Sequence, residues 1–190
     1  MAPFQFVGGA LALDFTNTVG NRLDDETSRD YFVTPADAAA WIERAKLGEG
    51  ETVSPAALAR LKEFRELLYR VFSALATERR PSAADLERLD AVVHQARSHQ
   101  HLAMTPDAFV WRPEPLPAWK RALFEVALSA EQLLVSGDYR QVRRCEDDRC
   151  GWLFVDRSRG VRRRWCSMVD CGNRAKARRH YAKRTPSGAQ

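Results

Sequence analysis

Four cysteines lie close together near the C-terminal end of this 190-residue chain, and the sequence has no others. They form two pairs, Cys145 with Cys150 and Cys166 with Cys171, and each pair has four residues between its members. Thiolate sulfur is a ligand that zinc prefers, and zinc binds four thiolates in a tetrahedron with Zn–S distances of about 2.3 Å. We therefore expect these four cysteines to hold one structural Zn²⁺ ion.

A structural zinc is favoured over the other uses of clustered cysteines. The segment around them has few apolar residues, and a metal that contributes on the order of 10 kcal/mol supplies folding free energy that so small a core lacks. Free core cysteines and disulfides remain less favoured alternatives. Disulfides are less favoured because reducing buffers keep cytoplasmic thiols in the reduced form. A catalytic zinc needs an open coordination position, which four cysteine ligands do not leave.

Positive charge gathers in the same part of the chain. Residues 138–190 hold 15 Lys and Arg against six Asp and Glu, whereas residues 1–137 hold 15 against 19. This asymmetry predicts that only the C-terminal part meets a polyanion, of which nucleic acid is the commonest. Arginine outnumbers lysine there 13 to two, and its planar fork suits phosphates and guanine edges. The residues expected to contact nucleic acid are Arg162, Arg163, Arg164, Arg174, Lys176, Arg178, Arg179, Lys183 and Arg184.

Two other uses of these basic residues stay open. Four thiolates on Zn²⁺ leave a negative charge, which a few arginines would balance by hydrogen bonds to sulfur. The basic run after Cys171 could also be a solvated helical tail. Its charges are almost all of one sign, however, so ion pairing along the helix does not explain them.

Local signals indicate how the cysteines are positioned. The segment "GWLFVDRS" (151–158) reads as a strand and "VRRRWC" (161–166) as its partner, so a hairpin would return the second cysteine pair to the first. Ser167 and Asp170 form a capping signature that starts a helix at Met168. A knuckle, a hairpin and a basic helix together resemble a treble clef.

Capping signals divide the N-terminal part into helices. Thr34 and Ser54 each stand before a proline, which is typical of a helix start, and Ser82 begins a third helix. Between residues 58 and 75 apolar side chains recur every three or four positions, so the second of these helices should be long.

The remaining N-terminal segments are shorter or more ambiguous. Residues 4–7 read as a short strand, and residues 11–19 as a helix, although alternation in this stretch also fits a strand. Residues 20–32 read as a loop, and residues 99–113 as a small β-hairpin around a Thr-Pro-Asp turn. A last helix over residues 117–136 should end at Gly137.

The elements together indicate an α+β protein. A mostly helical N-terminal domain with a small β-hairpin is expected over residues 1–137, a C-terminal treble-clef-like zinc finger over residues 138–185, and a disordered tail over residues 186–190. The apolar stretch near the start is too short for a membrane span and lacks the basic flank of a signal peptide. We therefore expect a cytoplasmic protein without membrane contact.

The motifs of the C-terminal part resemble the CGNR zinc finger of bacterial proteins. The similarity rests on "RRWCSM", "CGNRAKARRH" and the first cysteine pair followed by "GWLF", and it covers residues 142–184. "GGALALDFTNTVGNR" near the start is similar to the opening motif of the ABATE domain, which often precedes this finger. The resemblance implies a four-cysteine zinc site, Gly172, Asn173 and Arg174 as the family signature, and DNA binding by a stress-responsive transcription regulator.

We therefore expect a zinc-binding transcription regulator that binds DNA through its C-terminal module. Its N-terminal domain would receive a signal, for example a small-molecule effector, or form a homodimer. The alternative is a zinc-stabilised module that binds protein or RNA without DNA specificity. An enzyme is not expected, because the sequence has no nucleophile elbow, phosphate loop or HExxH motif.

Polar residues of the opening motif have two readings. They could line a ligand pocket, or they could make caps and loop hydrogen bonds, which is the more common use of Asp, Asn and Thr. The residues in question are Asp14, Asn17, Thr18 and Arg22.

Overall fold

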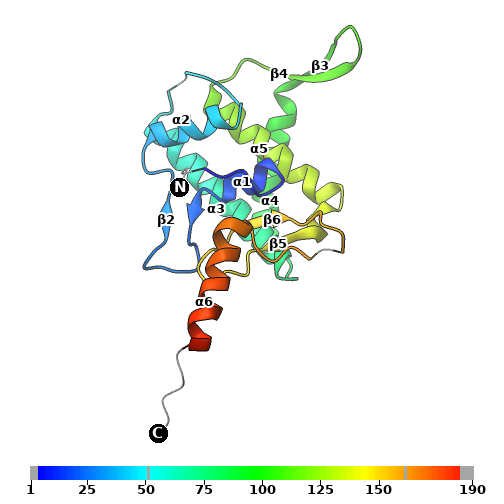
Figure 1. Ribbon diagram of the computed structural model, residues 1–190. Helices are drawn as coiled ribbons and strands as arrows, with labels where there is room; N and C mark the ends of the chain where they lie inside the picture. The colour runs from blue at the N-terminus through cyan, green and yellow to red at the C-terminus, as the bar shows by residue number, and fades with distance from the viewer. Residues whose placement is uncertain (1–3, 51, 161, 185–190) are drawn as a thin grey trace.

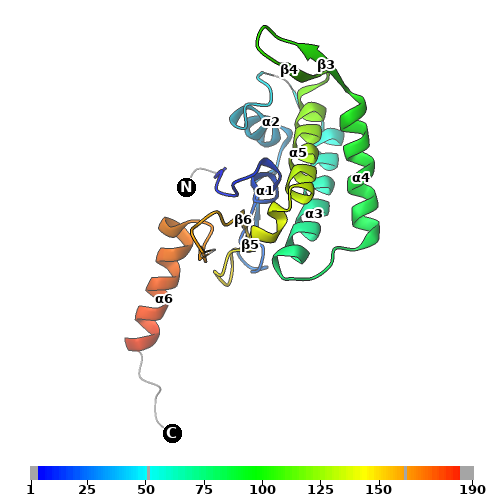
Figure 2. The same ribbon diagram turned by 90° about the vertical axis from the view of Figure 1, so that its right-hand side faces the viewer.

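The computed structural model of the chain describes residues 4–50, 52–160 and 162–184, the last three of these by their backbone alone. The predicted tail at residues 186–190 lies outside this range. Three long helices lie side by side and form the body of the molecule: α3 (Pro55–Ala76), α4 (Ala83–Ser98) and α5 (Ala118–Val135) (Figures 1 and 2). The short helix α1 (Leu11–Thr16) packs on α3 and α5, and so does α2 (Pro35–Arg44).

The predicted helix starts are confirmed by hydrogen bonds at the N-caps. The side chains of Thr34, Ser54 and Ser82 each accept a hydrogen bond from the backbone N–H three residues further on. These bonds satisfy donors that the first helical turn leaves without a partner. The last helix of the body, α5, stops before Gly137, whose φ of 85° is in the left-handed region that glycine adopts without strain.

The core lies between these helices, on the apolar face that the sequence predicted for α3. Leu61, Leu68 and Phe72 of this face are at most 1% exposed. Aromatic rings extend the core towards the short helices, where Phe15 of α1 lies with its ring centroid 5.1 Å from that of Trp41 in α2. This core fixes α1 and the loop after it, which matter for the cysteine cluster below.

Three two-stranded antiparallel sheets complete the fold of the described residues. The predicted hairpin at residues 99–113 is confirmed as β3 (Gln100–Met104) and β4 (Phe109–Pro113), and it projects from one end of the body (Figure 1). A second pair, β1 (Val19–Gly20) with β2 (Arg29–Asp30), lies where the sequence predicted a loop. The fold is α+β and mostly helical, as expected.

The strand predicted at residues 4–7 is wrong, because this segment pairs with no strand of the described chain. Its apolar residues serve the core instead. Phe4 is 7% exposed and packs edge-on against Tyr31 and Phe32, with ring centroids 6.4 and 6.0 Å away.

The partner predicted for the strand at residues 151–158 is also wrong. After a short 3-10 helix (Asp138–Gln141), β5 (Val142–Arg144) pairs with β6 (Leu153–Val155). The segment predicted as the partner, of which residues 162–166 are described, forms no ladder with β6. Asp156 instead closes the turn before this segment. Its carboxylate accepts hydrogen bonds from the backbone N–H groups of Ser158 and Arg163 at 2.9 and 2.8 Å.

The described part of the chain ends in a π-helical turn (Met168–Gly172) that continues into α6 (Asn173–Arg184). This helix points away from the body, at the end opposite the β3–β4 hairpin (Figures 1 and 2). No helix of the described residues is long and apolar enough to cross a membrane.

The C-terminal hairpin shares the core of the helical body. Val142 and Leu153 are 0% exposed and belong to the same cluster of buried residues as Leu68. The domain boundary near Gly137 remains a prediction from the sequence, but a chain cut there would leave apolar core surface uncovered on the helical body.

Hydrogen bonds from the side chains and the backbone tie the same hairpin to the segment around α1. The Asn17 side chain donates to the carbonyl oxygen of Leu153 and accepts from its N–H, both at 2.9 Å. Val155 N–H donates to Gly8 O, and Trp152 Nε1–H donates to Val19 O, at 2.8 and 2.7 Å. We call residues 7–23 the latch segment, because it holds the hairpin against the body.

Replacing Asn17 by Ala tests the latch. The change leaves two buried backbone groups of Leu153 without partners, so the free energy of unfolding should fall by about 2–4 kcal/mol. Denaturant unfolding of the full chain measures this, with Gln132→Ala on the exposed side of α5 as a control that should change little. Equal stability of the two variants would contradict a latch that depends on Asn17.

Candidate metal centre and nucleic-acid interface

The four cysteine sulfur atoms meet in one cluster, in which all of them lie within 4.8 Å of one another. Cys150 Sγ is 3.6 Å from Cys166 Sγ, which is 3.5 Å from Cys171 Sγ. A tetrahedron of sulfurs at Zn–S distances of about 2.3 Å has edges of about 3.8 Å, so the cluster fits this ion. All four residues are buried, at 2–4% exposure, and no disulfide joins them.

The first two ligands come from a knuckle between β5 and β6. Cys145 N–H donates to Trp152 O at 2.8 Å and closes the hairpin, while Cys150 N–H donates to Asp147 O at 3.0 Å and forms the turn. Gly151 has a φ of 70°, and a Cβ on it would lie 3.0 Å from the Cβ of Arg22 in the latch segment. The knuckle therefore needs glycine at this point, both for its backbone and for its packing.

The other two ligands come from the start of the last helix. Ser167 caps the π-helical turn by accepting a hydrogen bond from Asp170 N–H at 3.2 Å, as the capping signature predicted. Cys171 lies inside that turn, and Cys166 just before it donates its N–H to Cys145 Sγ at 3.4 Å. The helix start thus carries both the last ligand and a donor to the first pair.

Arg174 and Arg178 hold α6 against the knuckle. Each donates to Oδ2 of Asp147, whose side chain is completely buried, at 3.2 Å. Arg174 Nη2 also donates to Cys171 Sγ at 3.0 Å. Burial lowers the pKa of Arg174, but the Cys171 sulfur and the Asp147 carboxylate outweigh it and raise this pKa overall. Arg174 therefore supplies positive charge directly to the metal site.

Arg163 and Arg164 also bind within the chain. Arg163 donates to Trp165 O at 3.0 Å, to Val7 O at 3.1 Å and to Cys166 O. Its guanidinium lies 4.2 Å from the ring centroid of Phe154, which suits a cation–π contact. Arg164 forms an ion pair with Glu146, and both side chains are about half exposed.

The remaining predicted nucleic-acid residues that the structure describes are open to solvent. The side chains of Arg162, Lys176 and Arg179 are exposed and form no ion pair with any described residue. Arg179 donates only within its own helix, from Nε to Ala175 O at 3.4 Å. The side chains of Lys183 and Arg184 lie outside the described residues. The predicted set therefore divides into arginines that hold the finger and basic residues that face solvent.

The polar residues of the opening motif are buried and bonded within the chain. Asp14 accepts from Gly8 N–H at 2.7 Å, and burial raises the pKa of Asp14 to about 6. Thr18 Oγ1 accepts from Arg65 Nη1 at 3.3 Å. Arg22 forms an ion pair with Glu66 at 2.7 Å, and Asn17 binds Leu153 as described above. These contacts are of the loop-bonding kind, and a ligand pocket at these four residues stays a prediction.

Sequence reasoning missed Asp147, which is the hub between the knuckle and α6. A signal for it was present, because "CEDDRC" places three acidic residues inside a segment that is otherwise strongly basic. It also missed Tyr69, whose hydroxyl donates to Gly151 O at 3.1 Å from α3. No local pattern marks such a contact between residues 82 positions apart.

Comparison with known families gives two matches. Residues 9–137 match ABATE, described as a putative stress-induced transcription regulator, and residues 141–184 match the CGNR zinc finger. Neither description is that of an enzyme. A search of curated proteins found no match. The four buried cysteines form the zinc site of the finger.

Replacing Arg174 by Ala should weaken zinc binding about 10- to 100-fold, because the change removes the donor to Cys171 Sγ and one partner of Asp147. Arg179→Ala, five residues further along the same helix, should leave zinc affinity unchanged. Competition with a chromophoric chelator measures both variants. Equal zinc affinities would mean that Arg174 does not support the metal site.

Proposed function

Because the chain belongs to the ABATE family and ends in a CGNR zinc finger, we propose that it is a transcription regulator that binds duplex DNA through α6. The N-terminal domain receives the signal, and the protein acts in the cytoplasm, where thiols stay reduced and DNA is accessible. The observation that carries the proposal is a basic helix that the zinc site fixes at one end and leaves open to solvent at the other (Figure 2).

The shape and charge of α6 suit the major groove. An α-helix with side chains is about 10–12 Å across, and the major groove is about 12 Å wide. The helix sequence, "NRAKARRHYAKR", contains six basic residues and no acidic one. Because Arg174 and Arg178 are used at the knuckle, Lys176 and Arg179 are the described helix residues free to meet phosphates.

A path between the two parts supports signal reception by the helical domain. The latch segment bonds to the knuckle on one side, through Arg22 N–H to Cys150 O at 3.1 Å. On the other side, the backbone N–H of Ala12 donates a hydrogen bond to Ser129 Oγ of α5 at 3.1 Å. A shift of α5 would therefore reach the metal ligands through one short segment.

Removing the two free charges of α6 should weaken DNA binding in a salt-dependent way. In Lys176→Ala/Arg179→Ala, the plot of log affinity against log salt should become less steep by about two units, because two fewer counterions are released. Mobility shift or fluorescence anisotropy with duplex DNA measures this on the zinc-loaded full chain.

The control removes the same charge elsewhere. Arg44 and Arg80 are exposed residues of the helical domain, so Arg44→Ala/Arg80→Ala should bind DNA like the unchanged protein. If both double variants behave alike, α6 does not contact DNA. Tighter binding to single-stranded RNA than to duplex DNA would favour the RNA-binding alternative.

We also propose that the protein forms a homodimer through the β3–β4 hairpin. The register places Leu102 opposite Trp111 and Met104 opposite Phe109, so all four side chains lie on one face of the ribbon. They are 59–76% exposed, which is unusual for large apolar residues gathered in one place.

A second copy of the chain is the occupant that this face fits. An aromatic residue buries roughly 150–250 Å² when covered, so four large apolar side chains from each copy approach the total of about 1,000 Å² that a specific interface needs. An isolated two-stranded hairpin is at best marginally stable, and pairing two copies would cover the apolar face of the hairpin in each copy. In a two-fold dimer the same face of each copy would meet, which gives an isologous contact.

Replacing Trp111 by Lys should raise the dimer dissociation constant about tenfold or more, since aromatic residues dominate such interfaces. Sedimentation velocity over a concentration series measures this. Val135→Lys changes another exposed apolar residue, 80% exposed at the end of α5, and should leave the association unchanged. A protein that is monomeric at every concentration would refute the dimer.

A further inference from the structure

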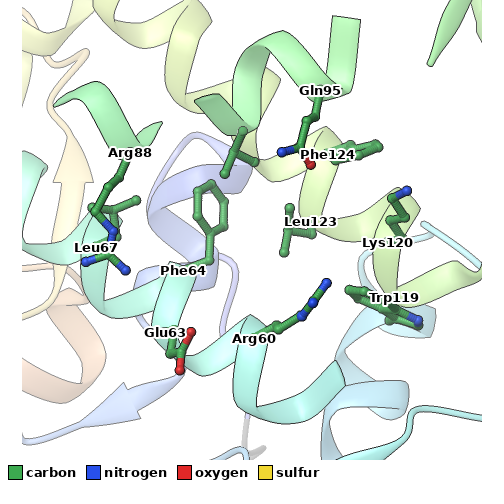
Figure 3. A pocket seen from close by; sticks show the side chains of 11 residues that line it. Arg60, Glu63, Phe64, Leu67, Arg88, Gln95, Trp119, Lys120, Leu123 and Phe124 are labelled. Carbon is green, nitrogen blue, oxygen red and sulfur yellow. The ribbon is translucent and has the colours of Figure 1, made fainter. Parts of the chain in front are cut away.

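A cavity of about 200 Å³ opens between the three long helices of the N-terminal domain. Figure 3 shows its lining, in which side chains from α3, α4 and α5 converge. The floor is apolar and partly aromatic, and consists of Phe64, Leu67, Val92, Trp119, Leu123 and Phe124. Phe64, Leu67 and Phe124 are only 3–5% exposed, so the floor is part of the packed core and keeps its shape.

The rim of this cavity is basic. Arg60, Arg88 and Lys120 lie around it together with a single acidic residue, Glu63. Within the described part of the chain, Arg60 and Arg88 form no ion pair, and Lys120 Nζ lies 5.4 Å from the ring centroid of Phe124. The rim thus carries three basic side chains against one acidic side chain, so positive charge is in excess there.

This local excess stands out because the surrounding domain has the opposite balance. Residues 1–137 contain 15 Lys and Arg against 19 Asp and Glu. A cleft lined by one sign of charge attracts ligands of the other sign. An apolar floor with a few convergent polar groups at its mouth is also the usual form of a small-molecule site.

We propose that the cavity binds a small aromatic carboxylate. The aromatic ring would lie on Phe64 and Phe124, and the carboxylate would reach Arg60 and Arg88 at the rim, where a charge-assisted hydrogen bond is strong. The size agrees, since an apolar cavity of about 150 Å³ holds benzene and this one is somewhat larger. The inference goes beyond DNA binding and does not depend on it.

The lining helices give such a ligand a route to other parts of the protein. α5 carries Ser129, which bonds the latch segment, and α4 and α5 flank the β3–β4 hairpin in the chain. A ligand that contacts α3, α4 and α5 at once would stabilise the arrangement in which these helices are packed together, relative to one in which they separate.

The test compares an acid with its neutral counterpart on the zinc-loaded full chain, without DNA. Calorimetry should show saturable binding of 3-phenylpropionate and at least about tenfold weaker binding of 3-phenyl-1-propanol, which lacks the charge. Arg60→Ala/Arg88→Ala should weaken binding of the acid about tenfold and leave the alcohol unaffected. The control variant Arg44→Ala/Arg80→Ala should bind both like the unchanged protein.

A further variant tests the place of binding. Leu123→Trp fills the cavity from α5, so it should abolish binding of both probes while circular dichroism and melting temperature show a folded chain. Equal affinity for acid and alcohol, acid binding that survives the loss of Arg60 and Arg88, or no saturable binding at millimolar concentration would each overturn the proposal. None of these outcomes bears on DNA binding, which is measured separately.

Discussion

The meeting of four cysteine sulfurs is the constraint on which the C-terminal part of this protein depends. Thiolates this close together repel one another strongly in a buried site, and a divalent metal is what makes the arrangement favourable. Zinc with four thiolates still carries negative charge, and the buried carboxylate of Asp147 adds to it. Arg174 compensates both charges by donating to Cys171 Sγ and to Asp147, and Arg178 compensates the charge of Asp147. The basic residues of the finger therefore fall into two groups. Some compensate the negative charge of the metal site, and others face solvent along α6.

The metal site is built into the helical body rather than attached to it. Val142 and Leu153 lie in the common core, and the latch segment supplies hydrogen bonds to the backbone of the knuckle and of β6. This arrangement explains the polar residues of the opening motif in structural terms. The Asn17 side chain pairs with the N–H and the carbonyl oxygen of Leu153, as a neighbouring strand would. The ABATE part and the zinc finger of this chain stabilise each other.

Much of the fold and the metal site followed from local sequence signals. The cysteine spacing predicted the ligands, and serine or threonine at the N-caps predicted where α2, α3, α4 and the last helix begin. The sequence did not predict β1, β2 or the partner of β6, because strands of two or three residues are too short to show a period. Asp147 and Tyr69 were missed because their roles depend on contacts between distant segments. Which of the arginines serve the metal site could not be predicted either, since this depends on which side of α6 meets the knuckle.

The attachment of α6 at one end makes it a lever. A helix of 12 residues is about 18 Å long, so a rotation of about 10° at its root moves its tip by about 3 Å. Successive base pairs of DNA are stacked about 3.4 Å apart. If α6 binds DNA as proposed, such a rotation would carry the tip of the helix across nearly one base-pair step.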